Sequence, residues 1–168
     1  MPFFTNPQKS RRDPHERVTS LVYVAAFAPS EGQSIVDMTK DYPPSSGLDH
    51  LVTDKEGFLT MSLEGISEHF AQDLPQADTR LMTVTQGPIR GTNFEEKVTA
   101  AAWRTKPSWF VVSEKDRMVQ PALQRANAEQ ISARIVSLPA SHVPQLSMPT
   151  EVADAIIAAA EVLVGSTN

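Results

Sequence analysis

Three short apolar segments rich in β-branched and aromatic residues constrain the fold of this chain more than any other feature. They are residues 18–27 (VTSLVYVAAF), 108–112 (SWFVV) and 134–138 (RIVSL), and each lies beside a proline or a charged turn. Runs of this length and composition are typical of strands in a parallel sheet that is covered on both faces. The sequence therefore predicts a parallel sheet that contains all three segments.

Two helical patterns accompany the second and third of these strands. Residues 121–132 begin at Pro121, which suits the first turn of a helix, and residues 149–164 have Thr150 as a candidate N-cap and Gly165 as a stop signal. Their expected apolar faces consist of Leu123, Ala126 and Ile131 in the first helix and of Val152, Ile156, Ala159 and Leu163 in the second. Strands that alternate with helices in this way indicate an α/β fold with right-handed crossovers.

The chain between the first two strands has a different character. Residues 30–105 contain loops rich in glycine and proline, expected helices near residues 63–74 and 78–85, and one weak strand signal at residues 58–61. We interpret this stretch as an insertion, mainly helical, of the size that forms a lid. Residues 1–17 are polar and proline-containing without periodicity, so we expect an irregular N-terminal arm and a single domain over residues 18–168.

Composition limits the classes of function. The chain has 168 residues, a formal net charge of -5 and no cysteine. Without a basic stripe there is no support for nucleic acid or an anionic membrane as a partner. No apolar run approaches the roughly 20 residues that span a bilayer, and the N-terminus lacks the apolar core of a secretory signal, so we expect a cytoplasmic protein.

The sequence also gives no sign of a cofactor. The four histidines are far apart in the chain and lack the two-histidine spacing of a zinc site; they are His15, His50, His69 and His142. The glycine-rich patterns of P-loop and dinucleotide-binding proteins are missing as well. We therefore predict neither a metal nor an organic cofactor.

Two candidate catalytic residues lie in loops that follow predicted strands. Asp116 is in the loop 113–121 and His142 is in the loop 139–149, and the carboxyl ends of parallel strands are where open α/β sheets bind ligands. An aspartate that precedes a histidine in this way matches the acid and base of a Ser-Asp-His triad. From the residues alone, however, Asp116 could equally shape a turn, and His142 could be a surface histidine.

Several longer segments resemble a group of bacterial α/β-hydrolases of the serine esterase type, and together they extend over about residues 18–164. The resemblance rests on LVYVAAFAPSEGQS, FAQDLP, TQGPI, AAWRTKPSW, PSWFVVSEKDRMVQPALQR and ASHVPQLSMPTEVADAII, in this order along the chain. It implies the C-terminal part of an α/β-hydrolase fold, with Asp116 as the acid and His142 as the base. It further implies a small ester or acyl compound as substrate. Asp73, within FAQDLP, could reach the pocket from the lid or could simply be a polar residue at the end of a helix before Pro75.

The nucleophile of that family is not recognisable here. The expected His-Gly and Gly-x-Ser-x-Gly motifs are absent, and the one pair of glycines with the right spacing, Gly87 and Gly91, has Ile89 at its centre. Ser10 and Ser20 precede the acid in the chain, but neither has flanking glycines. We therefore do not expect intact serine-hydrolase activity from this chain alone.

Three functional alternatives follow from these observations. The chain could serve ester hydrolysis with a nucleophile supplied elsewhere, it could bind an apolar small molecule without catalysis, or it could be an inactive fragment. The strand at residues 18–27 would also leave an apolar sheet edge unpaired, which favours a homodimer or a complementing subunit as partner. The sequence identifies neither the substrate nor whether Met1 is the true start.

Overall fold

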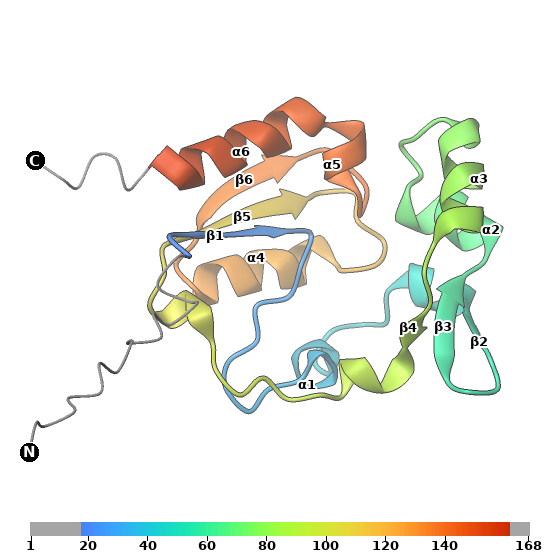
Figure 1. Ribbon diagram of the computed structural model, residues 1–168, viewed down its shortest axis with the longest axis horizontal. Helices are drawn as coiled ribbons and strands as arrows, with labels where there is room; N and C mark the ends of the chain where they lie inside the picture. The colour runs from blue at the N-terminus through green and yellow to red at the C-terminus, as the bar shows by residue number, and fades with distance from the viewer. Residues whose placement is uncertain (1–17, 162–168) are drawn as a thin grey trace, which may run out of the picture.

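The computed structural model describes residues 18–161, and its main element is a parallel sheet between two helices (Figure 1). The strands are β1 (Leu21–Val24), β5 (Ser108–Ser113) and β6 (Arg134–Leu138), in the order β1-β5-β6. Helix α4 (Pro121–Gln130) covers one face and α6 (Pro149–Glu161) covers the other. The prediction of an α/β fold with late parallel strands and flanking helices is confirmed.

Strand β5 forms the centre of this sheet, and all six of its residues are buried. Phe110 and Val112 face α4, where they pack in one cluster with Ala128. Val111 faces the opposite helix and packs against Val152. Successive side chains of a strand point to opposite faces of its sheet, so β5 contributes to one hydrophobic core on each face.

The observed β1 is shorter than the segment predicted at residues 18–27. It ends at Val24 because Ala25 has a φ of 45°, a left-handed conformation that breaks the extended chain. Its four residues are also only half-buried, since within residues 18–161 β1 is paired on one side alone. The expectation of a fully buried strand was therefore wrong for this segment, and also for β6, in which only Leu138 is buried. Both β5 and β6 begin at the predicted residues.

The faces of the two helices also differ in part from the prediction. Ala126 is exposed, and α4 instead buries the polar side chains of Gln124 and Asn127. In α6 Ile156 is 49% exposed and Ala155 takes its place in the core. Helix α6 begins at Pro149, so Thr150 lies within its first turn rather than at its cap. Leu163 and Gly165 lie outside the described residues.

Helices in the described part of the chain are also short with respect to a bilayer. None within residues 18–161 has the length and apolar character needed to cross a membrane. The predicted N-terminal arm, residues 1–17, lies outside the part of the chain that the structure describes.

The segment between β1 and β5, residues 25–107, is called the insert below, and its part with β2, β3, β4, α2 and α3 lies beyond the carboxyl ends of the main strands (Figure 1). The expected helix near residues 78–85 is present, and the one near residues 63–74 ends early, at Phe70. The insert also contains an antiparallel sheet, β2-β3-β4, of which only β3 was predicted. Its elements are α1 (Ile35–Thr39), η2 (Ser46–His50), β2 (Leu51–Thr53), β3 (Phe58–Met61), α2 (Leu63–Gly65), η3 (Ile66–Phe70), α3 (Gln76–Thr85), β4 (Ile89–Arg90), η4 (Gly91–Phe94) and η5 (Ala102–Arg104).

Local side-chain bonds explain why several of these short elements form. Ser34 caps α1 and forms a reciprocal capping box with Asp37. Asp54 stabilises the turn between β2 and β3, because its Oδ1 accepts the backbone amides of Glu56 and Phe58 at 2.9 Å each. These bonds replace backbone partners that such short helices and strands cannot supply on their own.

The two ends of the insert are tied together beside the main sheet. Gly32 donates its amide to the Val98 carbonyl at 2.8 Å, and Trp103 donates its indole N–H to the Pro29 carbonyl at 2.9 Å. Glu31 pairs with Arg104, with 2.7 Å between Oε2 and Nε. The segment that follows β1 and the segment that precedes β5 are therefore joined to each other beside the sheet, although β1 ends and β5 begins at opposite ends of it.

The insert also contacts the loop that follows β5, through Gly47. Its amide donates to the Arg117 carbonyl at 3.0 Å, and a Cβ at this position would lie 2.1 Å from Sδ of Met118. Only a glycine permits this close approach without movement of the loop.

We expect Gly47→Ala to lower the free energy of unfolding by about 1–3 kcal/mol, because the added methyl group overlaps Met118 and the Arg117 backbone. Gly87→Ala is the matched control, since a Cβ there meets nothing within 4 Å. The control should change stability by less than about 1 kcal/mol. Urea unfolding of both variants measures the difference, and equal effects would show that the Gly47 contact does not restrict the fold.

Candidate active site

Asp116 shapes the loop that follows β5. Its Oδ1 accepts the backbone amides of Met118 at 2.7 Å and of Val119 at 3.0 Å, which turns the chain toward α4. The turn-forming alternative considered from the sequence is therefore present in the structure. It occupies only one of the two carboxylate oxygens, so the other remains available for a different partner.

The second oxygen of Asp116 holds His142. Its Oδ2 lies 2.8 Å from Nδ1 of His142 and accepts a further hydrogen bond from Nε2 of Gln124 at 2.7 Å. The Asp116 side chain is fully buried in this arrangement. A buried carboxylate needs such hydrogen bonds to offset the loss of water, and here four donors surround it. The structure thus brings together the two residues that the sequence singled out.

Gln124 was not identified from the sequence, although it is fully buried and connects several parts of this site. Besides Asp116, it donates to the Val119 carbonyl at 2.7 Å and accepts the Ser113 amide at 2.9 Å. The available signal was its helical spacing, since Gln124 is beside Leu123 and four residues before Ala128 on the face that meets the sheet. A polar residue at such a position requires internal partners.

His142 lies in the loop between β6 and α5 (Pro144–Ser147). Its backbone amide donates to the Phe70 carbonyl at 3.2 Å, and its ring meets the Phe70 ring edge-on, with 4.8 Å between centroids. A carboxylate can only accept, so its bond to Nδ1 places the ring proton on that nitrogen. In the neutral ring, Nε2 then has the free lone pair that a general base requires.

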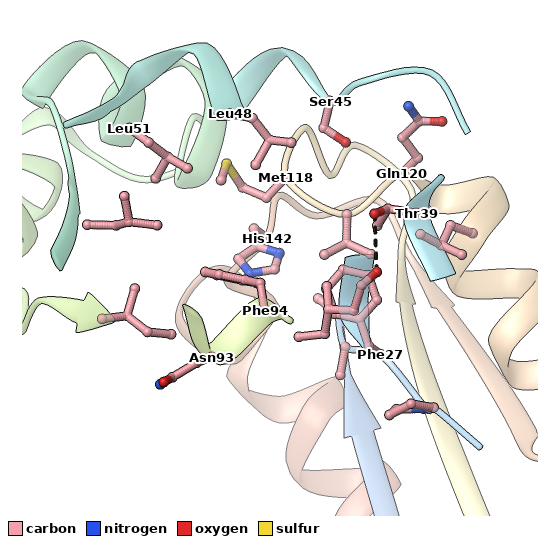
Figure 2. Close-up of a pocket in the computed structure, with 18 of the residues that line it drawn as sticks. Phe27, Thr39, Ser45, Leu48, Leu51, Asn93, Phe94, Met118, Gln120 and His142 are labelled. Atoms are coloured by element: carbon pink, nitrogen blue, oxygen red, sulfur yellow. Dashed lines mark hydrogen bonds between the residues drawn. The ribbon is translucent and has the colours of Figure 1, made fainter. Parts of the chain in front are cut away.

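A large cavity of about 1250 Å³ opens beside His142, between the main sheet and the insert. Figure 2 shows the imidazole at its wall, close to the side chains of Phe94 and Met118. Apolar groups from both sides of the cavity dominate its lining, among them Phe27, Leu48, Leu51, Met61 and Phe70. A concave, mostly apolar site with a convergent polar group is typical of small-molecule binding.

Within residues 18–161 no hydroxyl group is hydrogen-bonded to Nε2 of His142. Ser20 precedes β1 and thus lies at the end of the sheet opposite to His142, which excludes it as a partner. Ile89, at the centre of the one glycine pair with elbow spacing, is in strand β4 of the insert. Ser10 is outside the described residues.

Asp73, which was named from the sequence, and the two tryptophans of the chain have clear positions. Asp73 is not among the residues that line the large cavity; its Oδ2 accepts the backbone amide of Ser141 at 2.8 Å instead. Trp109 is 4% exposed and packs in the main sheet under Arg134. Trp103 is hydrogen-bonded to the Pro29 carbonyl, so both tryptophans have packing roles.

Over residues 18–161 no three acidic, histidine or cysteine side chains converge in a way that could hold a metal ion.

A comparison with known families identifies the family of the chain. The model of the family described as "Alpha/beta hydrolase family" matches residues 8–155, which is most of the chain. The chain belongs to this family. A search of the curated proteins gave no match.

Solved structures with the same fold are esterases and related hydrolases. A polyneuridine aldehyde esterase superposes with a TM-score of 0.69 at 14% identity, covering 85% of this chain and 62% of its own. A pyrethroid hydrolase from Sphingobium faniae gives 0.67 at 23% identity, covering 89% and 64%. A methylesterase from Arabidopsis gives 0.64 at 17% identity, covering 87% and 60%. The chain of this α/β-hydrolase family member thus spans less than two thirds of these relatives.

We expect Asp116→Asn to destabilise the protein by about 1–3 kcal/mol, because an amide NH₂ would face a fixed donor whichever way the side chain turns: two backbone amides at the Oδ1 position, or Nε2 of Gln124 at the Oδ2 position. Asp54→Asn is the matched control. Asp54 accepts its two backbone amides through Oδ1 alone, so an asparagine oxygen can replace it there. Urea unfolding should show a loss of less than about 0.5 kcal/mol for the control. A similarly small loss for Asp116→Asn would contradict the four-donor arrangement.

Proposed function

We propose that this chain provides the acid and base of an ester-hydrolysing active site, with His142 as general base and Asp116 as the residue that orients it. The observation that carries the proposal is the 2.8 Å bond from Nδ1 of His142 to a fully buried carboxylate, at the wall of a large apolar cavity. Family membership supports the reaction class.

The chemistry assigned to His142 is proton transfer at Nε2. A nucleophilic hydroxyl attacks the ester carbonyl while its proton passes to this nitrogen, and the carbonyl–alkoxy bond then breaks as the imidazolium returns the proton to the leaving alcohol. A water molecule, deprotonated by the same nitrogen, hydrolyses the acyl intermediate and restores the hydroxyl. Asp116 stabilises the imidazolium in both halves of the reaction.

The cavity supports an ester with a sizeable apolar part. Its walls combine aromatic side chains such as Phe27, Phe70 and Phe94 with aliphatic ones from the insert. In this proposal the insert acts as a lid that covers the substrate and keeps water from the reacting carbonyl. A pyrethroid hydrolase is among the solved structures that have this fold.

We place the nucleophile on a segment that adds to the unpaired edge of β1. A parallel strand in that position would end beside Ala25 and Phe27, which line the cavity next to His142. Such a segment would contribute main-chain hydrogen bonds to an edge that is otherwise free within residues 18–161, and it would deliver a serine to the face that Nε2 can reach.

A second candidate is a binding module that holds an apolar molecule without catalysis. It is favoured by one observation, namely that among the described residues no hydroxyl is bonded to Nε2. The two candidates differ in one requirement, because only hydrolysis needs His142 to exchange a proton with a nucleophile.

The test is a fusion of this chain with the part of a pyrethroid hydrolase that carries the family's His-Gly and Gly-x-Ser-x-Gly motifs. We expect the fusion to react with a fluorophosphonate probe and to hydrolyse p-nitrophenyl esters. His142→Ala should lower kcat/KM on the order of 10⁴-fold or more. His50→Ala is the matched control, since His50 stacks on His69 away from the cavity and should leave turnover unchanged.

Two results would contradict the proposal. One is a folded fusion, verified by circular dichroism and gel filtration, that neither reacts with the probe nor turns over ester. The other is turnover that survives His142→Ala. Saturable binding of an apolar ester by the unfused chain, together with the first result, would favour the binding module.

A further inference from the structure

The segment from Glu68 to Asp73, called the bridge below, joins the insert to both loops of the candidate site. Toward the histidine loop, the Phe70 carbonyl accepts the amide of His142 at 3.2 Å and Oδ2 of Asp73 accepts the amide of Ser141 at 2.8 Å. The bridge therefore holds two consecutive backbone amides of that loop, one of which belongs to the proposed base itself.

The same bridge also holds the loop of Asp116. Nε2 of Gln72 donates to the Lys115 carbonyl at 2.7 Å, and the Glu68 carbonyl accepts a hydrogen bond from the guanidinium of Arg117 at 2.6 Å. Lys115 and Arg117 directly flank Asp116 in the sequence. The insert thus forms hydrogen bonds with the residues on both sides of Asp116, and with His142 and the residue before it.

The local structure of the bridge explains why these groups are available. Helix η3 has π geometry and ends at Phe70, so the carbonyls of its last residues have no partner inside the helix. The carbonyls of Glu68 and Phe70 find their donors in the two loops instead. Asp73 follows the helix end and contributes the one negatively charged acceptor of the set.

The electrostatics of Asp73 agree with this role. Partial burial alone would raise the pKa of its carboxyl group, but the hydrogen bonds that Ser141 donates outweigh it and lower the pKa below its ordinary value. The carboxylate form therefore accepts the Ser141 amide at neutral pH. Ser141 is fully buried, so without Asp73 its amide would lose its partner.

We propose that Asp73 is a positioning residue. By accepting the backbone amide of Ser141, the residue before His142, it fixes the His142 ring against Asp116. This inference rests on the proposed function, since it concerns the same dyad, but it adds a requirement that the dyad alone does not contain. The insert is then part of the apparatus that orients the base, in addition to any role as a cover.

The experiment follows the proton on Nδ1 of His142 by NMR in the intact 168-residue chain, with His142→Ala to identify the signal. The hydrogen bond to Asp116 protects this proton from exchange with water. We expect Asp73→Ala to accelerate its exchange roughly tenfold, the effect of removing one charge-assisted hydrogen bond. Asp73→Asn keeps an acceptor oxygen and should accelerate exchange by a smaller factor.

A control variant separates positioning from general stability. Thr79 is 2% exposed, and its hydroxyl bonds only within α3, so Thr79→Ala weakens the insert without removing a hydrogen bond between the bridge and the two loops. We expect it to lower the unfolding midpoint in urea while the exchange rate of the His142 proton stays that of the parent. Equal acceleration by Thr79→Ala and Asp73→Ala would overturn the proposal, because the effect would then be one of overall stability.

The remaining outcomes also decide the question. Unchanged exchange in a folded Asp73→Ala variant would overturn the positioning role, and if that variant does not fold, unchanged exchange in Asp73→Asn would do so. The readout does not depend on turnover, so failure of the proposed hydrolysis leaves it intact. In an active fusion, Asp73→Ala should lower kcat on the order of 100-fold with KM nearly unchanged, as expected for a misplaced base.

Discussion

The carboxylate of Asp116 is the group on which the arrangement of this molecule depends most. Its two oxygens accept hydrogen bonds from its own loop, from Gln124 in α4 and from His142 in the loop after β6. A charge with no exposed side-chain surface is tolerated in a protein only when such donors surround it. The carboxylate therefore fixes the relative placement of the elements that supply the donors, and the fold and the site share one interaction.

This dependence extends to the insert. The strands β5 and β6 of the main sheet position the loops that contain Asp116 and His142. The insert contacts the same loops on their other side, through Gly47 and the bridge. The imidazole is left with one nitrogen bound and the other directed toward an apolar cavity. A base that is restrained on one side and accessible on the other suits proton transfer, whereas a ligand-binding pocket alone would not require this restraint.

Much of the sheet could be predicted from the sequence, because strands such as residues 134–138 depend on local composition and on the prolines beside them. Asp116 and His142 became candidates because parallel strands bring the loops at their carboxyl ends together, and the resemblance of the surrounding segments to a hydrolase family gave them the roles of acid and base. The contacts of Asp73 and Gln124 were not foreseeable in this way. Each joins residues that are distant in sequence, and a polar side chain gives no local indication of the partner it will find.

The insert illustrates the same limit. The strands β2 and β4 contain three and two residues, and their half-exposed side chains lack the alternation that identifies a strand. They form because β3 lies between them and supplies their hydrogen bonds. The terminal carbonyls of η3 likewise accept hydrogen bonds from loops that are distant in sequence, and nothing in residues 66–70 alone distinguishes this segment from an ordinary helix.

The tie between the two ends of the insert, at Pro29 to Gly32 and Val98 to Arg104, has a consequence for how this family can diversify. Once the ends of a chain segment are closed on each other, lengthening the segment costs little, because the entropy of closure grows only with the logarithm of its length. Residues can therefore be gained or lost between these ends while the strands beneath keep their register. The tie between the two ends allows the size of the cavity to vary in evolution almost independently of the sheet that supports it.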